Sequence, residues 1–219
     1  EAVSDIDGVK RVRFTSPHPQ DMDEYLLQVM TENDKICKHI HLPLQAGSDR
    51  VLKRMNRTYT KNKYLTLVDK IRNYMPDCTL TTDIIVGFPG EKNAEFSETL
   101  EVMRQVEFQN AFMFKYSPRP GTKAAEYSNQ IEEEIKQERL ERLIELQKEI
   151  TLKVNEKYIN KTVEVMVEKT SKKSPEQWAG RTDSNIWVVF DKSNEKIKDI
   201  IKIRITAAKG VTLFGQTIN

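Results

Sequence analysis

TLTTDIIVG, residues 79–87, ends in an apolar run that stops at a glycine. A near-continuous apolar run is typical of a strand that is covered on both faces, as the strands of parallel sheets are. Residues 94–106 follow, with Phe96, Leu100 and Met103 on one helical face. We therefore predict a strand followed by a helix here, which is the repeating unit of an α/β fold.

The same alternation extends on both sides of this unit. Further strands are predicted at residues 9–14, 39–44 and 111–116, and further helices at residues 21–30, after Ser48 and after Thr60. Strand–helix alternation at this spacing implies right-handed crossovers and a parallel sheet. Four strands fit an open sheet, and they fit equally a piece of a (β/α) barrel whose first strands are missing.

The pattern changes in the last third of the chain. From residue 131 it predicts one long helix, with a buried stripe formed by Leu140, Leu143, Ile144, Ile150 and Val154. Beyond residue 158 the apolar period becomes two, and strands are predicted at residues 163–167, 186–190, 200–205 and 211–218. Short strands joined by polar turns indicate a small antiparallel barrel. We place a domain boundary near residue 155, between domains of residues 1–154 and 155–219.

The charge is divided unevenly between these two domains. The chain has 35 Lys and Arg and 33 Asp and Glu, a net charge of +2. Residues 1–154 carry 23 basic and 25 acidic side chains (net −2), and residues 155–219 carry 12 and 8 (net +4). The second domain is therefore the candidate for contact with a polyanion. No apolar run approaches the roughly 20 residues that span a bilayer, so a membrane partner is not expected.

The two cysteines, Cys37 and Cys78, are too few and too far apart for several common sites. They exclude a disulfide scaffold, a four-cysteine zinc site and a self-contained iron–sulfur cluster, so we expect two reduced cytosolic thiols. Standard hydrolase, phosphate-loop and dinucleotide motifs do not occur. The chain begins without methionine and without a signal peptide, which suggests the cut end of a longer chain.

An unusual polar segment follows each predicted parallel strand. The four segments are residues 15–19, 43–50, 87–91 and 117–122. Ligands bind at the carboxyl ends of such strands, so four segments at one edge predict a binding rim, although any one alone could be an ordinary turn. Gly87 and Gly90 permit close backbone approach, and we expect their N–H groups to be free for a ligand.

Histidines provide a weaker signal for a site. His39 and His41 are two apart on a strand and project to the same face. A metal pair is conceivable, but no third ligand follows at a suitable spacing, so core or ligand-contacting histidines are preferred. His18, between two prolines, is interpreted as a loop anchor or a substrate contact rather than a base.

The C-terminal domain has a cluster of basic and aromatic residues around one polar connection: Lys169, Lys172, Lys173, Trp178 and Arg181. Basic side chains beside an aromatic suit single-stranded or looped RNA, because phosphates meet the charges and bases can stack. The alternative is a solvated hairpin with Trp178 in the small core.

These segments together resemble one family. The strings RFTSPHP (residues 13–19), HLPLQAGSDRVL (41–52), DIIVGFPGE (83–91) and SPRPGT (117–122) are similar to those of the radical-SAM methylthiotransferases. GRTDSN (180–185) resembles that family's TRAM domain, a small RNA-binding barrel. The resemblance implies a partial radical-SAM (β/α) barrel followed by a small antiparallel TRAM barrel.

The activity implied by the resemblance is the addition of a methylthio group to C2 of N6-isopentenyladenosine, next to the anticodon of tRNA. Two alternatives remain open. One is a sister methylthiotransferase that acts on threonylcarbamoyl-adenosine in tRNA or on a ribosomal protein. The other is a non-catalytic module that only binds RNA.

The resemblance also implies site residues and cofactors. Gln45 and Ser48 would contact the ribose of S-adenosylmethionine, and Val86 and Gly87 its adenine. Backbone from Phe114 to Tyr116 would complete that site, and His18 and Arg119 would meet an RNA phosphate or the modified adenosine. Two 4Fe-4S clusters are implied for the complete enzyme, but the Cys-x-x-x-Cys-x-x-Cys motif that would hold one of them is absent from this chain. We therefore assign no catalytic or metal-binding residue and expect the chain alone to be inactive. The implied partners are tRNA and an electron donor, in the cytoplasm.

Overall fold

Strand β2 (Thr79–Val86) lies at the centre of a three-stranded parallel sheet. It pairs with β1 (His39–His41) on one side and β3 (Asn110–Lys115) on the other. The computed structural model describes residues 1–15 and 18–218 and confirms the mixed α/β class. Strand β2, which carries the apolar run, is the central strand because it is hydrogen-bonded to a neighbouring strand on each edge.

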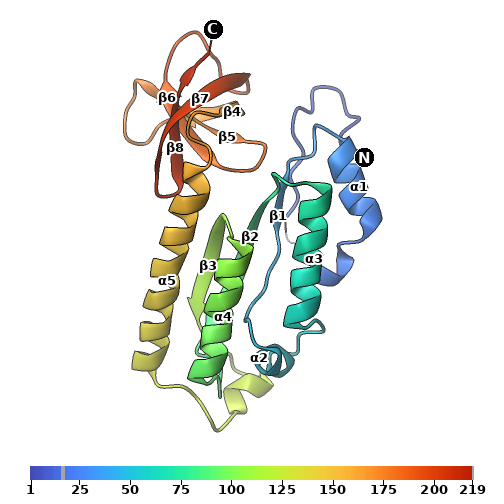
Figure 1. The fold of residues 1–219 in the computed structure, drawn as a ribbon, viewed down its shortest axis with the longest axis vertical. Coiled ribbons are helices and arrows are strands. Elements are labelled where there is room, and N and C mark those ends of the chain that lie inside the picture. Colours follow the sequence, from blue (N-terminus) through green and yellow to red (C-terminus); the bar gives the residue numbers. More distant parts are fainter. Residues whose placement is uncertain (16–17, 219) are drawn as a thin grey trace.

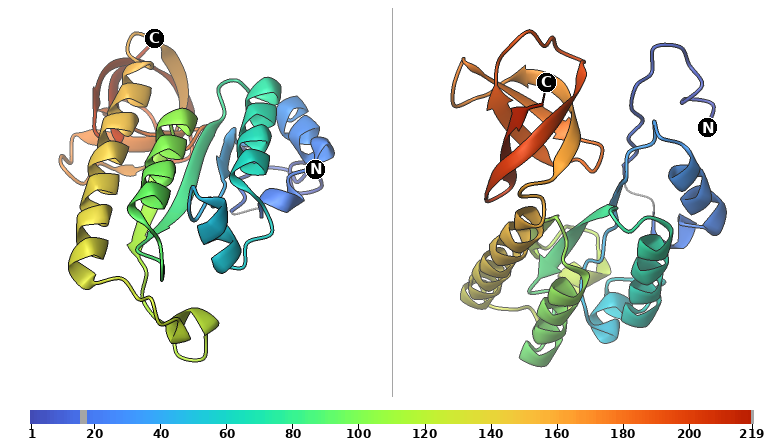
Figure 2. Two further views of the ribbon diagram at one scale, coloured as in Figure 1. Left: turned by 60° about the horizontal axis from the view of Figure 1, so that its bottom comes forward. Right: turned by 45° about the horizontal axis from the view of Figure 1, so that its top comes forward.

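The helices lie on one face of this sheet. Helices α3 (Lys61–Tyr74), α4 (Asn93–Val106) and α5 (Glu133–Glu156) form the covering layer, and α1 (Glu24–Glu32) packs on α3 (Figure 1, Figure 2). Short helices complete this part: α2 (Asp49–Arg54), η1 (Pro19–Asp21) and η2 (Lys123–Glu126).

Alternate side chains of β2 face opposite sides of the sheet. Ile84 and Val86 are fully buried on the helix-covered side. Asp83 and Ile85, which alternate with them along the strand, are only partly buried on the opposite side. That side, here called the open face, is not covered by any helix of the described residues (Figure 2). The open face is therefore available for a ligand or for another part of a longer chain.

The predicted strand at residues 9–14 is wrong. The structure has only one parallel bridge there, from Val12 to Ile36, outside the three-stranded sheet. Arg11 and Arg13, on either side of Val12, extend toward the C-terminal barrel instead. The segment of residues 9–14 is therefore tied to the barrel by its arginine side chains and does not pair with the parallel sheet.

Beyond α5 the chain forms a closed barrel of five strands in the order β4-β5-β6-β8-β7. The strands are β4 (Thr162–Thr170), β5 (Gln177–Thr182), β6 (Trp187–Asp191), β7 (Ile200–Lys209) and β8 (Thr212–Thr217). Its separate core is made of inward side chains such as Val165, Phe190 and Ile205. The pairing is antiparallel except between β6 and β8, which run parallel, a departure from the all-antiparallel prediction.

Strand β5 was not predicted from the sequence. Its residues were interpreted as part of one polar connection, because Gln177, Gly180 and Arg181 lack a clear apolar alternation. In the closed barrel, Gly180 lies so close to β4 that a β-carbon would meet Val165 Cγ1 at 2.7 Å. Glycine is used here for close packing between strands, which weakens the sequence signal for a strand.

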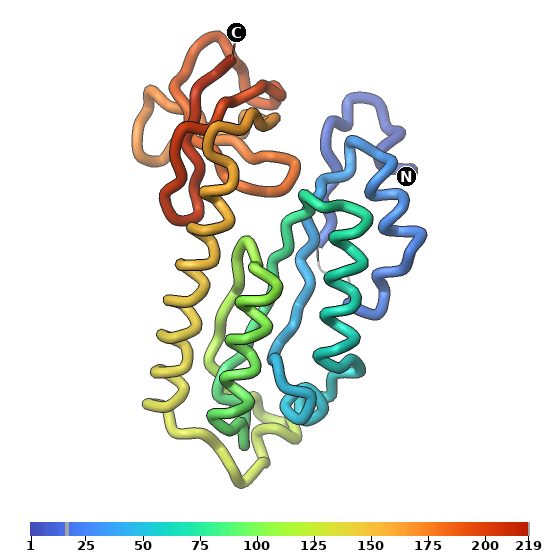
Figure 3. The backbone as a smooth tube through the Cα atoms, viewed as in Figure 1, coloured from blue at the N-terminus to red at the C-terminus, as the bar shows by residue number. Residues whose placement is uncertain are grey.

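The barrel contacts the amino end of the sheet through the turn between β5 and β6. Arg13 Nη2 donates to the Thr182 carbonyl O at 2.7 Å, and Arg13 Nη1 bonds to Asn185 Oδ1. Thr79 Oγ1 donates to the Ser184 carbonyl O at 2.6 Å. The N-terminal segment and the barrel both lie near the amino ends of the parallel strands, at the top of Figure 3.

Candidate functional site

A cavity of about 990 Å³ opens at the carboxyl ends of the parallel strands. Each loop that follows a strand contributes to its wall: Gln45 after β1, Phe88 after β2 and Ser117 after β3. The structure thus brings together three of the four expected polar segments. The fourth, residues 15–19, includes Ser16 and Pro17, which lie outside the described residues.

Gln45 is held in the cavity wall by a special backbone conformation. Its φ is 69°, in the left-handed region. Its N–H donates to the Asp83 carbonyl O at 2.8 Å, and its carbonyl O accepts from the Ile85 N–H at 2.9 Å. Such outliers persist where the surrounding structure holds them, often at ligand sites. Ser48 is 3% exposed and does not line the cavity.

Val86 and Gly87 lie behind the cavity wall. The Val86 side chain is fully buried on the helix-covered face. The Gly87 N–H donates to Glu91 Oε2 at 2.7 Å, and the Gly90 N–H donates to the Asn129 carbonyl O at 2.8 Å. The expectation that these two glycine N–H groups are free for a ligand is therefore wrong.

An aromatic wall lies on one side of the cavity. The Tyr116 ring meets the Phe88 ring edge to face with centroids 5.0 Å apart, and Phe88 meets Tyr127 at 6.4 Å. The Arg54 guanidinium carbon lies 4.4 Å from the centre of the Tyr127 ring. The Tyr116 hydroxyl is buried with no hydrogen-bond partner among the described residues. A planar ligand with a polar edge suits such a wall, because a buried hydroxyl is normally paired.

Positive charge concentrates around this cavity. One acidic side chain lines it, Asp83, against six basic ones: Lys53, Arg54, Arg57, Lys115, Arg119 and Lys123. Five of these have no carboxylate within 4.0 Å in the described part of the chain, since only Lys115 is paired. Arg54 donates to the Pro89 carbonyl O and to Asn129 Oδ1, and we call the other four the basic rim: Lys53, Arg57, Arg119 and Lys123. Unpaired cations that converge on a cavity favour an anionic ligand.

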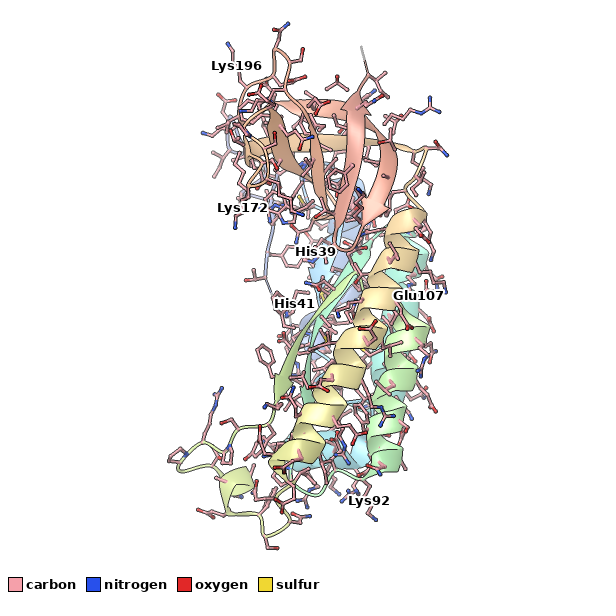
Figure 4. The ribbon with its side chains drawn as sticks, turned by 90° about the vertical axis from the view of Figure 1, so that its left-hand side faces the viewer. His39, His41, Lys92, Glu107, Lys172 and Lys196 are labelled. Carbon is pink, nitrogen blue, oxygen red and sulfur yellow. The ribbon has the colours of Figure 1, made fainter. Side chains whose placement is uncertain are left out.

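A row of polar side chains runs along the open face, and we call it the polar row. His39 Nε2 and His41 Nδ1 each lie 3.0 Å from Thr81 Oγ1, and His41 Nε2 lies 3.3 Å from Asp83 Oδ2. Figure 4 shows His39 and His41 between the barrel and the lower part of the molecule. Burial, reinforced by nearby positive charge, lowers the pKa of His39 to about 4, so this histidine is neutral at pH 7.

His18 and Arg119, both assigned to RNA by resemblance, lie in different places. The His18 ring packs at 5.8 Å against the Tyr59 ring, and its Nδ1 accepts from the Gln20 N–H at 3.3 Å. Arg119 lines the cavity, together with Tyr116 and Gln45. The structure therefore brings Arg119, but not His18, to the cavity.

The outer surface of the barrel pairs its basic residues with an aromatic that the sequence analysis did not select. Lys169 Nζ lies 4.4 Å from the centre of the Trp187 ring, and the Arg181 guanidinium carbon lies 5.1 Å from it. Arg181 also makes two hydrogen bonds to the Glu168 carboxylate, at 2.9 and 3.0 Å. Because Glu168 neutralises part of the Arg181 charge, Lys169 beside Trp187 is the freer of these two cations.

Trp178 is partly buried on the core side of β5 instead, with Lys192 Nζ 4.3 Å from the centre of its ring. It lies opposite Phe190 in the β5–β6 register and packs against the barrel core. Lys172 and Lys173 are exposed in the turn between β4 and β5, where Figure 4 shows Lys172. The predicted cluster is therefore divided: two lysines on a turn, Lys169 and Arg181 on the outer wall, and Trp178 against the barrel core.

Neither the two thiols nor any group of acids and histidines among the described residues forms a metal site. Cys37 and Cys78 are both buried and free, and burial raises the pKa of Cys78 to about 12. Within residues 1–15 and 18–218, no three His, Cys, Asp or Glu side chains are grouped so that they could hold a metal ion. The residues present do not fit an iron–sulfur cluster. None of the helices in the described ranges combines the length and apolarity needed to cross a membrane.

Sequence reasoning missed Ile85 and Phe112 and considered only the backbone of Phe114; all three share the open face with the polar row. Asp83 lies opposite Phe112 and Ile85 opposite Phe114 in the β2–β3 register. The period of two along each strand could have placed them together. The apolar run of β2, however, does not itself say which face the helices cover.

Comparison with known proteins now adds to this geometry. Residues 1–103 match the model of the Radical SAM superfamily, and residues 156–218 match that of the TRAM domain. A tRNA-2-methylthio-N(6)-dimethylallyladenosine synthase of Phocaeicola vulgatus is 48% identical over 219 residues, covering 100% of this chain and 47% of the relative. Along its whole length, the chain is similar to radical-SAM methylthiotransferases.

Further relatives of this family carry the same name. Those of Acetivibrio thermocellus and Moorella thermoacetica are 45% and 44% identical, over 99% and 100% of this chain and 45% and 49% of their own lengths. The chain thus spans about half the length of these radical-SAM methylthiotransferases. A solved structure, coproporphyrinogen III oxidase from Escherichia coli, a radical SAM enzyme, superposes with a TM-score of 0.51 at 13% identity, covering 76% of this chain and 45% of that one. This likeness shows the fold alone.

Proposed function

We propose that this chain is the part of a MiaB-type tRNA methylthiotransferase that carries the open face, the cavity and the RNA-binding barrel. The reaction is the addition of a methylthio group to C2 of N6-isopentenyladenosine next to the anticodon. The observation that carries the proposal is identity of 44–48% along the whole chain to relatives with this named activity. Work on tRNA implies a cytoplasmic protein.

The cavity fits S-adenosylmethionine. Its volume of about 990 Å³ is in the range of small-molecule sites, and its wall combines apolar surface with a few polar groups. We assign Gln45 and Tyr116 to this ligand, the latter because its buried hydroxyl needs a partner. Ser48, Val86 and Gly87 support the wall from behind. When bound, S-adenosylmethionine supplies the methyl group and the precursor of a carbon radical.

RNA is held, in this proposal, by two separate sets of cations. The barrel of residues 155–219 contributes Lys169, Lys172 and Lys173, and the domain of residues 1–154 contributes Arg119 from the basic rim. Arg181 has a smaller part, because Glu168 already accepts two of its hydrogen bonds. The polar row lies between the two sets, so a nucleotide bound along the open face would contact both.

This chain alone is expected to bind no iron–sulfur cluster and to be inactive, because Cys37 and Cys78 cannot supply three thiolates. Anaerobic reconstitution with iron and sulfide, followed by iron analysis, tests this part. Stoichiometric iron with a cluster absorption band would contradict it.

Deletion of the gene that encodes this chain tests the proposed reaction. Mass analysis of tRNA nucleosides should show loss of the methylthio group from the isopentenyladenosine type only. Loss of methylthiolation from the threonylcarbamoyl type, with the isopentenyl type intact, would reject the proposal in favour of the sister enzyme. Unchanged nucleosides of both types would favour a ribosomal-protein substrate or a binding module.

A further inference from the structure

Two large aromatic side chains are exposed on the open face. Phe112 and Phe114 are each 52% exposed, although most other phenylalanines of the α/β part are buried in its core. They are two apart on β3 and therefore on the same face, and Ile85 lies opposite Phe114 on the neighbouring strand. These three side chains form an apolar strip beside the polar row. Contiguous exposed apolar surface of this kind marks a binding site more often than scattered single residues do.

The strip is held in position before any ligand arrives. The Phe112 ring meets the His41 ring edge to face with centroids 5.7 Å apart. His41 is itself fixed by Thr81 at 3.0 Å and Asp83 at 3.3 Å. A side chain held in its bound conformation loses little entropy on binding, so the strip is suited to selective recognition.

The strip is also continuous with the cavity, because Ile85 and Phe114 line both. A ligand that lies on the open face would meet hydrogen-bonding groups of the polar row on one side and apolar surface on the other. An adenine with an alkyl group on N6 has this division: polar ring edges and a branched five-carbon chain. We propose that Phe112 and Phe114 form the subsite for the apolar N6 substituent of the substrate adenosine, an inference that rests on the proposed function.

The strip disfavours the anionic substituent of the sister substrate. A threonylcarbamoyl group carries a carboxylate, which would lose hydration against Phe112 with Asp83 as its neighbour in register. The cation nearest along β3, Lys115, is already paired with Glu133. The basic rim belongs to α2 and the residues after it, to the loop after β3 and to η2. Phe112 is therefore the residue that selects an alkyl substituent on N6 over a substituent that carries a carboxylate.

Binding of anticodon stem-loop RNAs to the 219-residue chain tests this inference. Three loops differ only at the nucleotide next to the anticodon: N6-isopentenyladenosine, adenosine or N6-threonylcarbamoyladenosine. Fluorescence anisotropy should give about tenfold tighter binding of the isopentenyl loop than of the adenosine loop, the effect of burying roughly two methylene groups. The threonylcarbamoyl loop should bind no better than the adenosine loop.

Substitutions locate the effect. Phe112→Ala and Phe114→Ala should each reduce the isopentenyl preference to about twofold or less while affinity for the adenosine loop stays the same; Phe112→Leu should keep most of the preference. Tyr25→Ala, which removes a 64% exposed aromatic from α1, is the matched control and should change neither value.

The outcomes separate this inference from the function on which it rests. Equal binding of all three loops by the unchanged chain, or an isopentenyl preference that survives Phe112→Ala and Phe114→Ala, overturns the inference and leaves RNA binding intact. A preference for the threonylcarbamoyl loop overturns the inference and the proposed substrate together. Failure to bind any loop contradicts both the inference and the proposed RNA-binding role.

Discussion

A missing β-carbon decides how closely α4 approaches the loop after β1. A β-carbon on Gly47 would lie 2.5 Å from Thr99 Cα, and the Gly47 N–H donates to Thr99 Oγ1 at 2.9 Å. Because the colliding atom is backbone, it cannot rotate away as a side chain can. The contact fixes the loop that carries Gln45 into the cavity wall.

We predict that Gly47→Ala lowers the free energy of unfolding by about 1–3 kcal/mol, since α4 must shift to accept the methyl group. Urea denaturation measures this loss. Gly121→Ala is the control, because no atom lies within 4 Å of its β-carbon position and only its φ of 80° opposes the change. An unfolding free energy for Gly47→Ala equal to that of the unchanged chain would show that the close approach at Gly47 is unimportant.

The two tryptophans of the barrel should respond differently to substitution. Trp187→Ala, on the outer surface beside Lys169, should weaken stem-loop RNA binding by about 1–3 kcal/mol if a base stacks there, with the melting temperature nearly unchanged. Trp178→Ala should mainly destabilise the barrel, because it removes a side chain packed on the core. Anisotropy titrations paired with thermal melts distinguish these effects. Reversed roles would mean that Trp178 is the stacking residue after all.

At the scale of elements, α4 and α5 are joined at one end by a charge cluster. Glu107 ends α4 and accepts from Lys153 Nζ at 2.5 Å and from Lys157 Nζ at 2.7 Å. These two bonds lower the pKa of Glu107 from 4.5 to about 2. A depressed folded-state pKa stabilises the fold above the unfolded pKa, and this contribution is lost as the pH falls toward 2.

Glu107→Gln should therefore lower the free energy of unfolding at pH 7 by up to about 1 kcal/mol, a modest value because the cluster is partly exposed. The difference from the unchanged chain should shrink between pH 4.5 and pH 2. Denaturant unfolding at several pH values measures it. Glu145→Gln, which affects one exposed pair with Lys148, is the control. A difference that does not depend on pH would contradict the assignment to the Glu107 charge.

The link between the loop after β2 and helix α5 explains why Gly87 is not a ligand contact. Glu91, 3% exposed, accepts from the Gly87 N–H and from Arg139 Nη1 at 2.8 Å. Burial raises the pKa of Glu91, while these two bonds favour its charged form. The loop is thereby tied to α5, which leads into the barrel. The segment therefore positions the cavity wall, and Phe88 is the side chain of this loop that lines the cavity itself.

At the scale of the whole molecule, cations that bind RNA are predicted at two distant places. Each phosphate contact on single-stranded RNA contributes about 0.7 to the slope of log affinity against log salt. Replacing Lys53, Arg119 and Lys123 of the basic rim with alanine should flatten this slope by about 2. The Lys172→Ala, Lys173→Ala double variant should flatten it by about 1 to 1.5. Stem-loop titrations from low to high salt measure both.

A control and two contrary outcomes make the salt experiment decisive. Lys148→Ala, which removes an exposed cation paired with Glu145, should leave the slope unchanged. A rim variant whose slope equals that of the unchanged chain would show that phosphates do not reach the cavity. Coincident slopes for the double-lysine variant would show that the turn between β4 and β5 is only a solvated hairpin.

Charge along the sequence proved a poor guide to where RNA cations gather. Residues 1–154 have a net charge of −2, yet they contain the whole basic rim, because their acids are paired or lie elsewhere. The barrel has a net charge of +4, but Arg181 is bonded to Glu168, thirteen positions earlier. Pairing across the fold decides which charges remain available, and a count along the chain cannot include it.

The sequence alone determined most of the succession of strands and helices, the change from a period of 3.6 to a period of two, and the resemblance to radical-SAM methylthiotransferases. These are local properties, because periodicity and turn residues act over a few neighbouring positions. Only the tertiary structure decided that Arg13 bonds to Asn185, 172 positions away, that residues 9–14 leave the sheet, and that Phe112 shares a face with His41. Each of these three features depends on strand register or on packing between segments that are distant in the sequence. The conformational preferences of neighbouring residues do not determine which distant segments pack together.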